Sequence, residues 1–263
     1  MDKYINKIIC GDCLEVMQDI PDKSVDLTVT SPPYDNLRDY EGYSFNFECI
    51  AKELYRIMKI GGVVVWVVKD QVVNESETGT SFKQALYFKK IGFNLHDTMI
   101  YQKNVMPFPE QTRYIQCFEY MFVFSIGKPE THNMIKEKTL GYKPSKSSCQ
   151  RNQDGTTSKL EYEQGKEYRS KWNVWIYDVG FNKTTKDKIA YQHPAQFPEK
   201  LAADHIISWS NENDIVLDPM VGSGTTCKMA KNLNRRYIGI DTSEKYCQNA
   251  RDRISNTEEP IFK

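Results

Sequence analysis

The sequence lacks a long apolar run, a net charge and a regular set of cysteines. No stretch approaches the ~18 apolar residues of a membrane span, and no apolar segment follows a basic start, so we expect neither a membrane-spanning nor a secreted protein. Lys plus Arg (35) balance Asp plus Glu (35), so net charge argues neither for nor against a nucleic-acid partner. Seven irregularly spaced cysteines do not form the pattern of a disulfide framework, and we expect a reducing cytoplasm.

The cysteines also lack the partners that a metal site needs. Cys10-Gly-Asp-Cys13 has the spacing of a redox pair or of half a zinc site, but the chain has no second Cys-x-x-Cys and no paired histidines. We therefore interpret this segment as a strand end that places Asp12, and we expect no bound metal.

Alternating strand and helix patterns are present towards both ends of the 263-residue chain, which is long enough for one α/β domain with an insertion or for two small domains. Strands that alternate with helices imply a mostly parallel sheet covered on both sides. Residues 94–102 and 117–126 are expected to be antiparallel edge strands. The other expected strands are 8–11, 25–30, 63–68, 215–217 and 237–240, and the expected helices are 14–20, 45–59 (broken by Gly61-Gly62), 81–91, 198–209, 225–233 and 243–254.

Residues 127–190 lack this regularity, and we expect loops there rather than core. From residue 128 to 190, 13 Lys plus Arg stand against 8 Asp plus Glu. This mixture of cations and aromatic rings suits contacts with phosphates and stacking on bases, although a solvated surface can have the same composition. The rings belong to Tyr142, Tyr162, Tyr168, Trp172, Trp175 and Tyr177.

The segment Val29-Thr-Ser-Pro-Pro-Tyr34 is the most informative about chemistry. Consecutive prolines cannot donate backbone hydrogen bonds and fix φ near about −65°, so they end the strand and stiffen the loop. A serine hydroxyl, a proline carbonyl and an aromatic ring are thereby held at a strand end, which suits a flat ligand with an amino group, such as a nucleobase. An ordinary loop in which Tyr34 covers core fits the same residues.

A second motif follows the strand expected at 215–217. Asp218-Pro-Met-Val-Gly-Ser-Gly-Thr-Thr226 is a Gly-x-Gly turn that opens a helix, where the backbone can approach a ligand closely and the helix N-terminus favours electron-rich groups. Asp241 stands 19 residues beyond Gly222, where a strand-end carboxylate can accept hydrogen bonds from ribose hydroxyls. Cys227 replaces the third glycine of a dinucleotide fingerprint, and no phosphate-loop lysine is present. We expect a nucleoside ligand without a pyrophosphate.

Together these segments resemble the amino-group DNA methyltransferases that depend on S-adenosylmethionine. Their order, with Thr30-Ser-Pro-Pro-Tyr34 first and the Asp218 segment near the carboxyl end, resembles the circularly permuted beta group of N4-cytosine and N6-adenine enzymes. The resemblance implies an α/β fold with a Rossmann-like, seven-stranded methyltransferase sheet and a small target-recognition insertion. It divides the chain into a catalytic half (1–127), the insertion (128–190) and a cofactor-binding half (191–263).

The resemblance also implies S-adenosylmethionine as cofactor and double-stranded DNA as substrate, and it is compatible with a cognate restriction endonuclease and with a homodimer. Gly11-Asp-Cys13 matches the segment whose acid contacts the cofactor adenine, and His193-Pro-Ala-Gln-Phe-Pro-Glu-Lys-Leu201 resembles the motif beside the methionine end. Met220 departs from the usual Phe but can still pack against the cofactor. The implied cofactor-binding residues are Asp12, Cys13, His193, Phe197, Asp218, Pro219, Met220, Gly222, Ser223, Gly224, Thr225 and Asp241.

The implied catalytic residues are Ser31, Pro32, Pro33 and Tyr34. A nucleobase amino nitrogen is a poor nucleophile because its lone pair is delocalised into the ring, and acceptors outside the ring plane favour a pyramidal nitrogen that can attack the sulfonium methyl. Ser31 Oγ and the Pro32 carbonyl are the candidate acceptors, and Tyr34 is the candidate ring that stacks on a flipped base. The chain has no Pro-Cys dipeptide, which disfavours methylation of a cytosine ring carbon.

The target base is predicted from Ser31, since serine at this position resembles the N4-cytosine signature, whereas N6-adenine enzymes more often have Asp or Asn. We expect cytosine N4, with adenine N6 as the alternative, because serine can accept a hydrogen bond from either base. Methylation of RNA or of a protein glutamine amide is disfavoured by the permuted order and the basic insertion. A catalytically silent DNA-binding or cofactor-binding subunit is disfavoured by the intact Ser31–Tyr34 segment.

Overall fold

The computed structural model describes residues 1–33, 45–104, 112–139, 148–160, 167–193 and 196–257. The chain forms two compact units, a larger one of residues 1–133 and 173–263 and a smaller one of residues 134–172. No helix in the described ranges combines the length and the apolar character that crossing a membrane requires.

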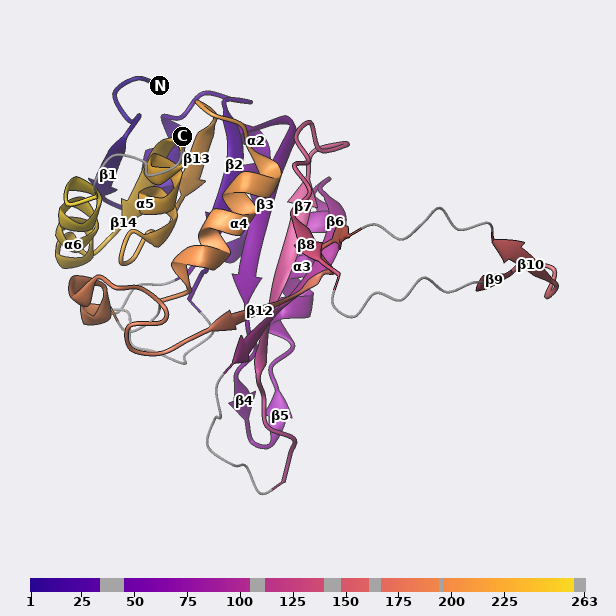
Figure 1. Ribbon diagram of the computed structural model, residues 1–263. Coiled ribbons are helices and arrows are strands. Elements are labelled where there is room, and N and C mark those ends of the chain that lie inside the picture. The colour runs from indigo at the N-terminus through magenta and orange to yellow at the C-terminus, as the bar shows by residue number, and fades with distance from the viewer. Residues whose placement is uncertain (34–44, 105–111, 140–147, 161–166, 194–195, 258–263) are drawn as a thin grey trace. The chain divides into compact units, whose positions relative to one another are not determined.

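An eight-stranded sheet, counted over the described residues, organises the larger unit (Figure 1). The first five strands in spatial order run parallel, the sixth is antiparallel to both of its neighbours, and the last is parallel to the seventh. Their order is β1 (Lys7–Cys10), β14 (Arg236–Asp241), β13 (Ile215–Asp218), β2 (Val25–Thr30), β3 (Met58–Val68), β7 (Phe118–Ser125), β6 (Asn94–Asn104) and β12 (Val174–Asp178).

The strand β12 corrects two expectations, since the sheet was predicted to have seven strands and residues 128–190 were predicted to lie outside it. Trp175 and Tyr177 alternate with exposed residues along β12 and are only 5% and 4% exposed. Burial of two large rings favours this strand at the sheet edge. These two rings are therefore part of the core and do not present a surface for stacking on bases.

The strands β7 and β6 are antiparallel to each other, as predicted, but neither is an edge strand. β7 lies between β3 and β6, and β6 is covered in turn by β12. The break predicted at Gly61-Gly62 is also wrong, because helix α2 ends at Ile57 and β3 begins at Met58 and continues through both glycines.

Helices cover both faces of the sheet, as the alternation of elements predicted. On one face α1 (Cys13–Gln18), α2 (Phe47–Ile57) and α3 (Thr80–Lys90) bury their apolar positions against the strands. Figure 1 shows the helices of the other face in front of the sheet: α4 (Glu199–Trp209), α5 (Thr225–Asn232) and α6 (Glu244–Ser255).

Short elements complete the structure. The larger unit also contains β4 (Val72–Val73) paired with β5 (Ser76–Glu77), and a 3-10 helix, η1 (Lys188–Gln192). The smaller unit contains two antiparallel pairs, where loops were expected. They are β8 (Lys136–Lys138) with β11 (Tyr168–Ser170) and β9 (Ser148–Arg151) with β10 (Thr157–Leu160).

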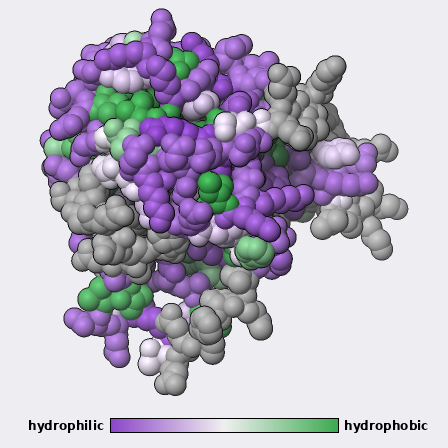
Figure 2. Space-filling model, turned by 90° about the vertical axis from the view of Figure 1, so that its left-hand side faces the viewer, coloured by the Kyte–Doolittle hydropathy of each residue, from purple (hydrophilic) through white to green (hydrophobic). Residues whose placement is uncertain are grey.

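The surface and the thiols agree with the composition. Seen from the side of β1 and α6, the molecule is mainly hydrophilic, with apolar residues in scattered patches (Figure 2). All seven cysteines are free thiols in the structure.

Candidate active site at the carboxyl edge of the sheet

The two sequence motifs meet at the carboxyl ends of neighbouring strands. β2, which precedes Ser31, pairs in parallel with β13, which precedes the glycine turn. At their ends Thr30 Oγ1 donates to Asp218 Oδ1 at 2.7 Å, and both residues are buried. Thr226 Oγ1, from the first turn of α5, donates to the Val29 carbonyl at 3.0 Å. Two buried hydrogen bonds therefore tie the motifs together, and their predicted meeting is confirmed.

The Ser-Pro-Pro segment leaves the sheet at the predicted point. β2 ends at Thr30, and the next residues are a half-buried Ser31, a buried Pro32 and a half-buried Pro33. Tyr34, the predicted stacking ring, lies outside the described residues. Ser31 thus directly follows Thr30, whose side chain bonds to Asp218, the first residue of the glycine-turn motif.

Asp218 is a buried acid at the centre of this junction. The residue is 2% exposed, and burial raises the pKa of its carboxyl group to about 6, although the Thr30 hydroxyl and the Met220 N–H stabilise the charged form. Pro219 is buried and Met220 is half-buried against the core. Asp218 therefore holds the start of the turn by accepting hydrogen bonds.

The turn needs its two glycines. Gly222 and Gly224 have φ of +48° and +84°, which residues with a Cβ rarely adopt. A Cβ at Gly222 would lie 2.8 Å from His193 Nε2, and a Cβ at Gly224 would lie 2.8 Å from Ala250 Cβ. The His193 ring thus lies directly on the turn, and Tyr246 packs edge-on against it at 4.4 Å between ring centroids. The structure therefore brings the His193 segment to the predicted cofactor turn.

The Asp241 carboxylate lies at the end of β14 and shapes the same turn. Its Oδ2 accepts from the Gly222 N–H at 2.9 Å, and its Oδ1 accepts from the Ser243 N–H at 3.0 Å. A carboxylate has about four acceptor positions, so these two bonds do not saturate it. The group can hold the turn and still accept hydrogen bonds from a ligand.

Asp12 lies just beyond the end of the neighbouring strand β1 and has a local role that no sequence motif predicted. Its Oδ1 accepts from the Leu14 N–H at 2.7 Å, so Asp12 is the N-cap of α1. Cys13 is buried. The preceding Gly11 N–H donates to the Asp241 carbonyl at 2.9 Å, which aligns the ends of β1 and β14.

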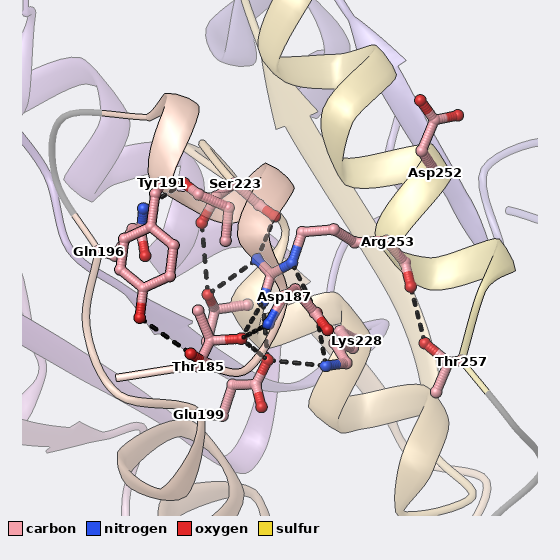
Figure 3. Close-up of polar contacts among 12 residues, drawn as sticks. Thr185, Asp187, Tyr191, Gln196, Glu199, Ser223, Lys228, Asp252, Arg253 and Thr257 are labelled. Atoms are coloured by element: carbon pink, nitrogen blue, oxygen red, sulfur yellow. Dashed lines mark hydrogen bonds and ion pairs between the residues drawn. The ribbon is translucent and has the colours of Figure 1, made fainter. Parts of the chain in front are cut away.

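No sequence pattern predicted the charged network that lies behind the turn. Arg253, on α6, is 2% exposed and reaches Ser223, Asp187 and Glu199 (Figure 3). It also bonds to Thr225. Phe197, one of the implied cofactor-binding residues, is half-buried and lies just before Pro198, the N-cap of α4. No local pattern marks Arg253 in the sequence, because its partners lie 28 to 68 positions away.

Comparison with known proteins identifies the family. A family model named N6_N4_Mtase and described as DNA methylase matches residues 25–252. The chain belongs to this family of amino-group DNA methyltransferases. It is 56% identical over 244 residues to the orphan methyltransferase M.BamHII of Bacillus amyloliquefaciens, covering 91% of this chain and 92% of that protein.

Solved methyltransferase structures share the fold. The M1.HpyAVI–SAM complex matches with a TM-score of 0.63 at 23% identity, covering 94% of this chain and 98% of that one. The PvuII DNA methyltransferase, described as cytosine-N4-specific, matches with a TM-score of 0.70 at 18% identity, covering 95% and 87%. The Rossmann-like α/β fold is thus confirmed, and S-adenosylmethionine is the methyl donor of the family to which this chain belongs.

Proposed function

We propose that this DNA methyltransferase transfers a methyl group from S-adenosylmethionine to the N4 amino group of cytosine in double-stranded DNA. The observation that carries the proposal is the buried hydrogen bond between Thr30 and Asp218, which joins the strand of Ser31 to the strand of the glycine turn. An acceptor for an amino group and a turn suited to a nucleoside are thereby held at one edge of the sheet.

The residues at this edge fit the cofactor. Gly222 and Gly224 form a turn without side chains at the N-terminus of α5, where a ligand can approach the backbone. The Asp241 carboxylate is an acceptor suited to ribose hydroxyls, and the Asp12 carboxylate is an acceptor suited to an adenine amino group. Met220 and His193 flank the turn and are the proposed neighbours of the methionine end.

The proposed chemistry needs positioning rather than covalent catalysis. The cofactor supplies an activated methyl group on a sulfonium. Ser31 Oγ and the Pro32 carbonyl accept the two amino hydrogens of the base outside the ring plane, which favours a pyramidal nitrogen whose lone pair is less delocalised into the ring. Attack by this nitrogen on the methyl carbon would break the bond between that carbon and sulfur, and the methylated nitrogen would then lose one proton to solvent. Ser31 favours cytosine, and adenine N6 is the alternative that the experiment below distinguishes.

The smaller unit supports a DNA substrate. In its β8–β11 pair, Lys136 lies opposite Ser170 and Lys138 lies opposite Tyr168, so these four residues share one face of a two-stranded ribbon. Tyr168 and Trp172 are 52% and 64% exposed, and the major groove of DNA admits a ribbon of this kind. We propose that this unit, which corresponds to the core of the predicted target-recognition insertion, contacts DNA.

A restriction endonuclease and a second copy of the chain are the two candidate protein partners. M.BamHII is named an orphan methyltransferase, which favours a chain that acts without a cognate restriction endonuclease. A homodimer stays a prediction, which sedimentation of the purified protein at several concentrations would test.

Incubation with labelled S-adenosylmethionine and mixed-sequence duplex DNA, followed by digestion to nucleosides and mass spectrometry, tests the proposal. Label on N4-methylcytosine is the expected result. Label on N6-methyladenine would overturn the choice of base, and label on RNA or protein alone would overturn the DNA substrate. Absence of any transfer would support a silent subunit.

A further inference from the structure

We propose that the network around Arg253 is a clamp that holds the glycine turn against the His193 segment and thereby sets the affinity of the site for S-adenosylmethionine. The network consists of Arg253, Lys228, Asp187 and Glu199. The inference rests on the proposed function and adds a positioning residue, Arg253, that no sequence motif identifies.

The guanidinium of Arg253 connects three parts of the chain (Figure 3). Nη1 donates to the Ser223 carbonyl and to Thr225 Oγ1, the latter at 3.3 Å. Nη2 donates to Glu199 Oε1 at 2.8 Å, and Nε donates to Asp187 Oδ2 at 3.1 Å. A planar fork with five N–H donors can serve these directions at once, which a lysine ammonium cannot do.

The contact with Ser223 acts on the turn itself. Ser223 lies between Gly222 and Gly224, the two residues with positive φ. Two glycines leave this backbone free to rotate in the absence of other constraints. A fixed Ser223 carbonyl sets the plane of the Ser223–Gly224 peptide, and the Gly224 N–H is held in turn by the Val221 carbonyl at 2.8 Å. Arg253 therefore limits the conformations of the turn that would receive the cofactor.

The two carboxylates lie on either side of His193 in the sequence. Asp187 directly precedes η1, and Glu199 is the first residue of α4. His193, whose ring lies on Gly222, falls between them in the sequence. By pairing with both acids, Arg253 fixes the chain before and after His193 relative to the turn that His193 covers.

Charge balance makes the clamp sensitive to the loss of one member. Lys228, on α5, lies 2.7 Å from both Asp187 and Glu199, so two cations face two anions. The side chain of Arg253 is 0% exposed and that of Lys228 is 11% exposed. Burial opposes ionisation of Asp187, but its bonds to Lys228 and Arg253 lower the pKa of that carboxyl group overall. Removal of Arg253 would leave two partly buried acids, whose side chains are 31% and 22% exposed, with one cation, which is unfavourable.

The chain offers a control for a purely structural effect in Arg56, which has a similar set of bonds although its side chain is 30% exposed. Arg56 also donates to two backbone carbonyls, of Ile20 at 2.9 Å and Met17 at 2.7 Å, and also pairs with two acids, Asp22 and Glu53. It lies at the end of α2, directly before β3 begins, and thus at the opposite edge of the sheet from the site. Arg56→Met should destabilise the fold without touching the cofactor turn.

The test measures the Kd of S-adenosylmethionine by calorimetry, kcat at saturating cofactor, and Tm, for the wild type, Arg253→Met, Arg253→Lys and Arg56→Met. We expect both Met variants to lower Tm. Arg253→Met should weaken cofactor binding by at least about tenfold, because charge-assisted hydrogen bonds to the turn are lost. Its kcat at saturation should change far less, and the Kd of Arg56→Met should stay close to that of the wild type.

Arg253→Lys keeps the positive charge but loses the planar guanidinium. We therefore expect Tm to fall less than in Arg253→Met, while the Kd of S-adenosylmethionine clearly rises. This variant decides the question if Arg253→Met does not fold. The clamp is refuted if the Arg253 variants bind the cofactor as tightly as Arg56→Met does. Failure of the wild type to bind S-adenosylmethionine would instead refute the proposed function, so the two failures are distinguishable.

Discussion

Asp218 should lower the stability of the protein at neutral pH, and Asp218→Asn should raise it. The carboxyl group is 2% exposed, and its Oδ1 accepts from Thr30 Oγ1 at 2.7 Å and from the Met220 N–H at 3.2 Å. An Asn Oδ1 can accept both bonds in the same place, since the two side chains have nearly the same shape. The substitution therefore removes the buried charge while keeping the bonds from Thr30 and Met220; the Thr226 hydroxyl, which also stabilises the charged form, keeps its bond to the Val29 carbonyl.

The magnitude follows from the pKa. Burial raises the pKa of Asp218 from 3.8 to about 6, a shift of about 2 units, and each unit corresponds to about 1.36 kcal/mol. Because the folded-state pKa is raised, the stability present below pH 3.8 is lost as the pH rises through about 6. We expect Asp218→Asn to be more stable than the wild type by about 3 kcal/mol at pH 8 and by about 0.5 kcal/mol at pH 4.

Urea unfolding followed by circular dichroism between pH 4 and 8 measures this difference. Asp19→Asn is a suitable control, because the Lys3 and Tyr4 side chains lower the pKa of the exposed Asp19 carboxyl group. That variant should gain no stability as the pH rises. The reasoning would be refuted if Asp218→Asn were less stable than the wild type at pH 8, or if the difference were the same at every pH.

Three further predictions concern the proposed site and the DNA surface. Ser31→Ala should lower kcat far more than it weakens cofactor binding, and equal losses, measured by methyl transfer and calorimetry, would contradict its role as an acceptor. Asp241→Ala should weaken cofactor binding by about ten- to a hundredfold, and an unchanged Kd would exclude the ribose contact. DNA affinity should fall steeply with added salt, and Lys138→Ala should reduce that salt slope by about 1 in a fluorescence-anisotropy titration; an unchanged slope would exclude a phosphate contact.

The fold was largely predictable because its signals are local. Val25–Thr30 has apolar residues at alternate positions and is followed after Ser31 by two prolines, and the strand has the predicted bounds. β12 was missed because its five residues are isolated within a polar, glycine- and lysine-containing stretch, and the burial that stabilises it comes from distant elements. Gly61-Gly62 was taken for a break because glycine usually ends regular structure, whereas here both glycines lie within β3.

The residues of the site also differ in whether a local sequence signal marks them. The glycine turn and Ser31 could be found because each motif is contiguous and its residue types follow from its geometry. Arg253 could not be found, because an arginine beside the buried Ala250 and Ile254 of α6 has no local pattern that distinguishes it from an exposed one. Its acids, Asp187 and Glu199, reach it only after α4, α6 and η1 have packed. Long-range charge pairing is the part of this site that only the folded chain reveals.

The permuted order of the motifs is compatible with one site because a parallel sheet gathers strand ends regardless of their order in the sequence. Thr30 and Asp218 are 188 positions apart, yet their side chains bond directly. Sliding β2 by one residue against β13 would turn the Thr30 side chain to the other face and break its bond to Asp218, which would cost about 1–3 kcal/mol if the Thr30 hydroxyl stayed buried without a partner. The bond therefore favours the single register in which Ser31 follows at the level of the glycine-turn motif, and specifies the distance between acceptor and turn on which the proposed methyl transfer depends.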